Sequence, residues 1–147
     1  MRKGVLVFAL TMLFSFNVYA ETLSASEQRL YQCQKKYIQE KKECTETWSM
    51  KCYDFLINAN KNAQRCYKDE AVKVLTKFYN LSEQDAQNKI DKYVNFIYDE
   101  YLFLYNDTNY CKQNNCGVSP YLYSEHTTTQ ELYDYTYKMI KSVSAHN

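Results

Sequence analysis

Six cysteines are the residues of this chain whose type and spacing most clearly carry chemistry. They lie at Cys33, Cys44, Cys52, Cys66, Cys111 and Cys116. The first four are spaced almost symmetrically about Ser49, and this arrangement suits two antiparallel helices joined by two disulfides. Thiols pair in this way in an oxidising compartment. The cysteines therefore predict how the protein is held together, without naming what it does.

Helix geometry narrows the pairings that six cysteines allow. Along one helix, Cys33 and Cys44 would lie roughly 16 Å apart, and Cys52 and Cys66 roughly 21 Å apart. The Cα atoms of a disulfide lie within about 7 Å of each other, so neither pair can bridge within its own helix. A chain that folds back between Thr45 and Met50 brings Cys44 to Cys52 and Cys33 to Cys66.

Two alternatives compete with this helical hairpin. If both helices were one continuous rod, Cys44 and Cys52 would lie about 12 Å apart and could not pair. The first four cysteines could instead bind zinc, but their spacings are much wider than those of most structural zinc sites. We expect the hairpin, with Cys111 and Cys116 closing a small ring in a loop.

The N-terminus has the pattern of a cleavable export signal. Two basic residues precede the apolar run 5–16, and residues 18–20 follow the small-x-small pattern of a cleavage site. The run is shorter than the roughly 20 residues that span a bilayer. We therefore expect residues 1–20 to be removed and residues 21–147 to form a single domain, with no membrane insertion after cleavage.

Charge and compartment narrow the class of partner. Removing Arg2 and Lys3 leaves 16 of the 18 basic side chains against 17 acidic ones, a net charge near −1. Nucleic acid would need a basic face to neutralise phosphates, so we do not expect it as a partner.

The predicted export signal indicates the location. We expect a bacterial periplasmic or secreted protein. In a eukaryotic secretory path the tripeptides that begin at Asn80 and Asn106 would be glycosylation acceptors.

The predicted fold class is all-α, a small disulfide-stapled domain of about four helices. Glycine and proline are nearly absent from the mature chain, which argues against a sheet with many tight turns. Apolar residues recur every three or four positions, the period of a buried helix face. This pattern predicts helices over about 25–44, 49–79, 82–105 and 128–144, with an irregular loop over about 106–126.

Several helix ends carry recognisable signals. Ser82 has the side chain of an N-cap, and Leu81 before it can pack onto the first turn. Asn80 can end the preceding helix in the left-handed conformation. Thr128 and Glu131 stand at the spacing of a capping box, and we expect the last helix to begin there.

Tyrosine is the most abundant aromatic residue, with 16 in the chain. The aromatic residues between positions 93 and 105 surround the helix predicted over 82–105 on more than one side. The excess must either pack under the loop that holds Cys111 and Cys116 or face a partner, as tyrosine does at many interfaces. We select the following candidate interaction surface: Tyr98, Tyr101, Tyr105, Tyr110, Tyr121, Tyr123, Tyr133 and Tyr137.

The two histidines, His126 and His146, give no sign of catalysis. We expect His126 in the loop and His146 in the C-terminal tail, both as solvated polar residues, whereas a hydrolytic triad needs a base held next to a nucleophile. The chain has no Cys-x-x-Cys motif and no glycine-rich phosphate loop. We therefore assign no catalytic residue, no metal ligand and no cofactor.

Three functional hypotheses follow. The first is an exported binding protein without catalysis, of the inhibitor, immunity or secretion-accessory type, with a protein partner. The second is a carrier of a small apolar ligand between the helices. The third is a hydrolase whose paired acids would be Asp99 with Glu100, or Asp85 with Asp91.

The paired cysteines resemble those of the coiled-coil-helix proteins of the mitochondrial intermembrane space. Those proteins use equal cysteine spacings in both helices, whereas this chain does not, so we assign no family.

Overall fold

The computed structural model describes residues 24–44, 50–117 and 119–145. The predicted signal 1–20, the connection 45–49 and His146 lie outside these residues. Within them the chain is entirely helical, and it forms five helices rather than about four. These are the N-terminal helix 24–42, α2 (Met50–Phe78), α3 (Glu83–Tyr105), α4 (Thr108–Asn114) and α5 (Pro120–Ala145).

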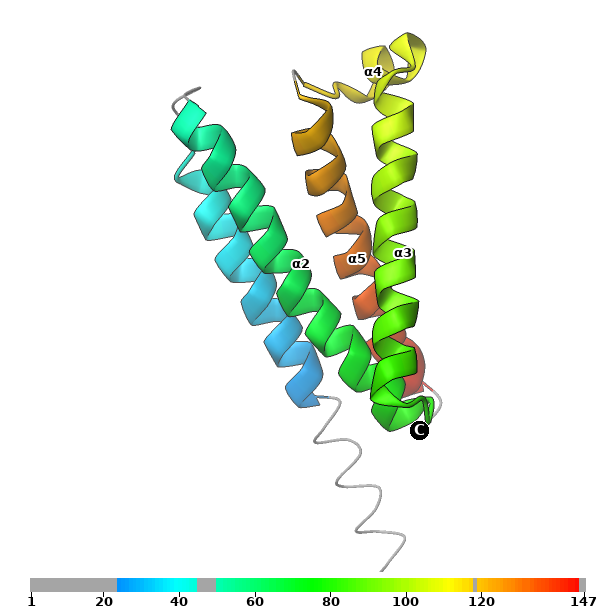
Figure 1. The fold of residues 1–147 in the computed structure, drawn as a ribbon. Coiled ribbons are helices and arrows are strands. Elements are labelled where there is room, and N and C mark those ends of the chain that lie inside the picture. Colours follow the sequence, from blue (N-terminus) through cyan, green and yellow to red (C-terminus); the bar gives the residue numbers. More distant parts are fainter. Residues whose placement is uncertain (1–23, 45–49, 118, 146–147) are drawn as a thin grey trace, which may run out of the picture.

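The four long helices lie side by side and alternate in direction along the chain (Figure 1). The N-terminal helix lies against α2, and α5 contacts both α2 and α3. The short helix α4 contacts α3 and lies beyond the end of the long helices (Figure 1). At that end α2 and α3 diverge, whereas they meet at the opposite end of the bundle. In the described part of the chain, no helix is both long and apolar enough to cross a membrane.

The N-terminal helix and α2 run antiparallel, because the partner numbers on α2 fall as those on the N-terminal helix rise. The pairs are Arg29 with Glu70, Cys33 with Cys66, Tyr37 with Asn60, and Cys44 with Cys52. Two of these pairs are covalent, so the N-terminal helix is fixed along its length rather than at one point.

The three disulfides join the cysteines that helix geometry pairs. The Cα atoms are 6.1 Å apart in Cys33–Cys66 and 5.5 Å apart in Cys44–Cys52. The second distance excludes a continuous rod through both helices, which would hold these atoms about 12 Å apart. Cys111–Cys116 closes the small ring, with Cα atoms 5.0 Å apart. No cysteine remains free, so the zinc hypothesis is wrong.

The core lies where α2, α3, α5 and the N-terminal helix meet. Its largest fully buried apolar side chains are Tyr67, Leu30, Ile90, Leu132, Ile140 and Val74. The buried face of α5 also contains Thr128, Thr129 and Thr136. The hydroxyls of Thr129 and Thr136 donate to backbone carbonyls four residues earlier, and that of Thr129 also accepts from Nε2 of Gln64 on α2 at 3.1 Å, so both are satisfied inside the core. This explains why α5 has a weak apolar pattern and is nevertheless buried.

The α2–α3 connection follows its sequence signals. Asn80 has a positive φ of 54°, the left-handed conformation that asparagine tolerates at a helix end. Ser82 is the N-cap of α3, and its hydroxyl accepts a hydrogen bond from the backbone N–H of Asp85 at 3.1 Å. Leu81 packs against the core cluster.

The predicted loop 106–126 is wrong over most of its length. α4 begins after Asp107, whose carboxylate accepts hydrogen bonds from the backbone N–H groups of Asn109 and Tyr110. α5 begins at Pro120, eight residues before the predicted start, and the hydroxyl of Ser119 accepts from the N–H of Leu122 at 3.3 Å. A serine N-cap followed by proline at the first helical position is a favourable start.

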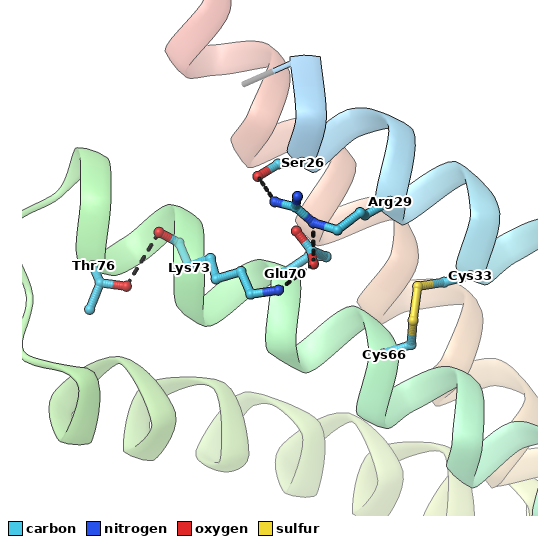
Figure 2. A network of polar contacts seen from close by, with 7 residues as sticks. All are labelled: Ser26, Arg29, Cys33, Cys66, Glu70, Lys73 and Thr76. Carbon is cyan, nitrogen blue, oxygen red and sulfur yellow. Dashed lines mark hydrogen bonds and ion pairs between the residues drawn. A yellow bond between two sulfur atoms is a disulfide. The ribbon is translucent and has the colours of Figure 1, made fainter. Parts of the chain in front are cut away.

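A buried carboxylate adds a polar contact between the N-terminal helix and α2 (Figure 2). Oε1 of Glu70 accepts from Arg29 at 2.9 Å and from Lys73 at 2.7 Å, and Arg29 also donates to Ser26. The side chain of Glu70 is 4% exposed, whereas those of Arg29 and Lys73 are 46% exposed. This network lies close to the Cys33–Cys66 bridge in the same view, so both act at one contact between the helices.

The substitution Glu70→Gln tests this contact. It removes the charge that both cations share while it preserves the shape of the side chain. We expect the free energy of unfolding to fall by about 1–3 kcal/mol, the range for weakening a buried hydrogen-bonded charge. Chemical denaturation of the oxidised protein measures it.

Asp69→Asn is the matched control, because it makes the same charge change at the neighbouring exposed position. We expect it to change the free energy of unfolding by no more than about 0.5 kcal/mol. An equal loss in both variants would mean that net charge, and not the buried contact, determines the effect.

Candidate functional site

A cleft lies at the end of the bundle where the N-terminal helix ends and α5 begins. It consists of two adjoining hollows with volumes of about 370 Å³ and 440 Å³, which share the side chains of Lys41, His126 and Gln130. These volumes are in the range of small-molecule sites. Four segments supply its walls: the N-terminal helix, α2, the end of α4 and the first turns of α5.

The walls of the cleft combine polar and apolar side chains. The first hollow is also lined by Gln34, Tyr37, Ile38 and Lys42. The second is also lined by Leu56, Asn60, Asn114, Asn115, Cys116, Leu122, Tyr123 and Thr127. Among the described residues, no carboxylate lines either hollow. The cleft therefore combines amide groups and a few apolar side chains with positive charge.

A directed chain of hydrogen bonds forms the floor of the cleft. The amide Nδ2 of Asn60 donates to the carbonyl of Leu56 at 2.8 Å, and its Oδ1 accepts from the Tyr37 hydroxyl at 2.7 Å. The single proton of Tyr37 is used in that bond, so its oxygen must accept from Nδ1 of His126, 2.7 Å away. Nδ1 therefore carries the ring proton, and Nε2 accepts from Nζ of Lys41 at 3.2 Å.

The titration properties of these groups agree with this assignment. Burial, together with the charge of Lys41, lowers the pKa of His126 to about 4, so the imidazole is neutral at physiological pH. Burial also lowers the pKa of Lys41 and raises the pKa of Tyr37. The prediction that His126 is a solvated loop residue is thus wrong: it lies in α5 and joins three helices.

The arrangement does not resemble a nucleophilic active site. Both ring nitrogens of His126 are engaged, with a phenol and an ammonium group, and neither contacts a serine, threonine or cysteine. Within the residues that the structure describes, no group of three histidine, cysteine or carboxylate side chains could hold a metal ion. The positive charge of Lys41 and the amide groups of the cleft can attract a polar or anionic group.

The acids of the hydrolase hypothesis lie elsewhere. Asp85 accepts from Ser82 at the start of α3, and Asp91 accepts from Lys68 and Gln87. The hydrogen bond from Lys68 lowers the pKa of Asp91. Asp99 and Glu100 are exposed on α3. None of these carboxylates lines the cleft.

Four of the eight candidate surface tyrosines form one cluster around Tyr123. The ring centroids of Tyr101, Tyr105 and Tyr110 lie 6.1, 6.1 and 6.5 Å from that of Tyr123. The hydroxyl of Tyr105 donates to the carbonyl of Gly117, and those of Tyr110 and Tyr123 are 3.0 Å apart. All four side chains are half-buried, and they join α3, α4 and α5.

The other four candidate tyrosines are distributed over α3 and α5. Tyr133 and Tyr137 stack with centroids 6.2 Å apart, and Tyr67 meets Tyr133 edge-on. Tyr98 is half-buried, and Tyr121 is 57% exposed. The eight tyrosines therefore do not form a single cluster, and their role as an interaction surface stays a prediction.

Two phenylalanines outside the selected set are more exposed than any of these tyrosines. Phe96 and Phe103 on α3 are 64% and 76% exposed. They are seven residues apart, close to two helical turns, so they lie on the same face. The buried residues Ala86, Ile90 and Val94 lie on a different side of the helix. The sequence signal for this face is that both phenylalanines fall outside the apolar stripe of α3.

The substitution His126→Asn tests the protonation state of the cleft. The amide of Asn can replace the Nδ1 donor but does not titrate. Folding lowers the pKa of His126 from about 6.5 to about 4. At pH values between these two, the unfolded chain therefore binds more protons at His126 than the folded chain does. The stability that neutral His126 contributes is complete above about pH 6.5 and is lost as the pH falls through about 4.

We therefore expect the free energy of unfolding to fall less steeply with acidification in the variant than in the wild type. Chemical denaturation at several pH values between about 7 and about 4 measures both slopes. The carboxylates titrate in both proteins, so their contribution cancels in the difference. Equal slopes would contradict a buried neutral imidazole.

Comparisons with known proteins add no identity to this geometry. No protein-family model, no curated protein and no solved structure matches the chain. Any statement about function must therefore come from the chain's own residues, which offer two features: the polar cleft around Lys41 and His126, and the exposed phenylalanine face of α3.

Proposed function

We propose that this protein is an exported, non-catalytic binding protein that docks another protein through the outer face of α3. The type is that of an inhibitor, immunity factor or secretion accessory. The observation that carries the proposal is the exposure of Phe96 and Phe103 on one helix face. Phenylalanine has no polar group to hydrate, so contact with a partner is the favourable way to cover these rings.

The support beneath this face is rigid, which favours binding. Tyr93 of α3 stacks on Tyr135 of α5 with centroids 4.4 Å apart. On the α2 side, Lys68 and Asp91 form an ion pair at 2.8 Å. A helix held from two neighbours loses little conformational freedom when a partner binds, so more of the contact energy becomes affinity.

The charges around the two phenylalanines suit a protein surface rather than a lipid. Lys89 and Lys92 precede Phe96, and Asp99 and Glu100 lie between the two rings, all exposed. An apolar centre with a rim of both charge signs is the usual anatomy of a protein–protein interface. We infer a folded partner protein with an apolar groove and a mixed-charge rim.

The disulfides and the predicted signal support the proposed compartment. Three disulfides without a free cysteine are typical of proteins outside the cytosol. Together with the predicted export signal 1–20, they support a periplasmic or secreted location. The hydrolase hypothesis gains no comparable support, because its proposed acids lie outside the described hollows. The exposed phenylalanine face of α3 favours protein docking over the carrier hypothesis as the main function.

The double variant Phe96→Ala with Phe103→Ala tests the docking face. We expect the affinity for a partner purified from the native envelope to fall at least about tenfold, since buried aromatic anchors contribute most to binding. Titration by biolayer interferometry measures the affinity. The melting temperature should not change, because both side chains are exposed and remote from the core.

Tyr31→Ala is the matched control, since Tyr31 is 60% exposed but lies on the N-terminal helix. We expect it to bind the partner like the wild type. Full binding by the double variant would exclude the α3 face. Concentration-dependent self-association of the pure protein that the double variant abolishes would show that the face joins two copies, and would also overturn the proposal.

A further inference from the structure

We infer that the cleft around Lys41 is a binding site for a carboxylate carried on a small apolar group. This inference is independent of the docking face on α3. The cleft is concave and positively charged, whereas the α3 face is an exposed aromatic surface.

The first argument is that no carboxylate among the described residues neutralises the charge of Lys41. Within the described part of the chain its ammonium contacts Nε2 of His126 at 3.2 Å and forms no ion pair with a carboxylate. The hydrogen-bond chain through Tyr37 makes that nitrogen a neutral acceptor. A half-buried ammonium without a nearby counter-charge attracts an anion more strongly than one in open water.

The hydrogen-bonding capacity of the cleft agrees with this charge. Lys41 has three N–H donors, of which one serves His126, so two remain for a ligand. The side-chain amides of Gln130 and Asn115 line the second hollow and can donate as well. Asn115 ends α4 in the left-handed conformation, with φ of 50°. Gln130 borders both hollows together with Lys41, and Asn115 borders the second.

The size and walls of the cleft indicate the rest of the ligand. The second hollow, about 440 Å³, has Leu56 and Leu122 in its wall, and the first has Ile38. An apolar group can pack on these side chains while a carboxylate meets Lys41. Phosphate is a poorer fit, because sites for it rely more on arginine or on several converging cations. Of the two lysines that line the cleft, Lys42 borders only the first hollow, so the second hollow combines the ammonium of Lys41 with amide donors and matches a single negative charge.

Two sources could present such a group: a free organic acid, or the C-terminal carboxylate of a peptide. The test titrates the oxidised protein with benzoate, with hexanoate, and with a tripeptide ending in leucine, by chemical-shift perturbation in NMR. We expect saturable binding of at least one probe, with dissociation constants of about 1 mM or below. Binding of the acids alone identifies the first source, and binding of the peptide but not of its C-terminal amide identifies the second.

Lys41→Gln tests the role of the charge. Glutamine can still donate to Nε2 of His126, so the hydrogen-bond chain is retained while the cation is lost. We expect at least about tenfold weaker binding, and recovery of most of the affinity in Lys41→Arg. Circular dichroism and the melting temperature verify that each variant is folded.

Lys35→Met is the matched charge control, since Lys35 is exposed on the same helix and outside both hollows. We expect its affinity to equal that of the wild type. Absence of saturable binding for all three probes, equal affinity in folded Lys41→Gln, or an equal loss in Lys35→Met would each overturn the inference. Inorganic phosphate that binds as tightly as the carboxylates would do so too.

Discussion

The disulfide between Cys33 and Cys66 is the constraint on which the rest of the structure depends. It fixes the N-terminal helix against the middle of α2, and this helix supplies Tyr37 and Lys41 to the cleft. Without that helix, the hydrogen bonds of His126 would have no partners. Because the loop it closes spans 33 positions, this link also removes the most freedom from the unfolded chain, in the chain-entropy view. A covalent link between two helices thus determines the geometry of a site on a third.

Several polar side chains are buried in the bundle, and some of them belong to an ordered chain of hydrogen bonds that reaches the cleft. In the series Asn60, Tyr37, His126 and Lys41, each side chain after the first donates a hydrogen bond to the one before it. Such a series selects one imidazole tautomer and one position of each helix, since a shift of any helix would leave a buried group without a partner. The series therefore aligns three helices, and it leaves positive charge at its open end.

The sequence predicts the disulfides well because their pairing depends on few geometric quantities: the rise of a helix and the reach of a disulfide. It predicts the start of α5 poorly because two competing signals exist. Thr128 and Glu131 have capping-box spacing, yet Ser119 and Pro120 form the actual start. Local spacing could not decide between them, since the choice depends on packing against α2 and α3. The error placed His126 in a loop, so the cleft could not be predicted: its residues come from four separate segments.

The tyrosines and the phenylalanines of α3 differ in a way that bears on function. Burial raises the pKa of Tyr110, whose hydroxyl pairs with that of Tyr123, and the hydroxyl of Tyr105 donates to the carbonyl of Gly117. These side chains thus have an intramolecular role, which accounts for much of the aromatic excess without any partner protein. Phe96 and Phe103 have no polar group that could be satisfied in this way, and they are exposed by 64% and 76%. Largely exposed apolar rings are the stronger indication of a docking face, so the phenylalanines, rather than the abundant tyrosines, carry the case for protein recognition.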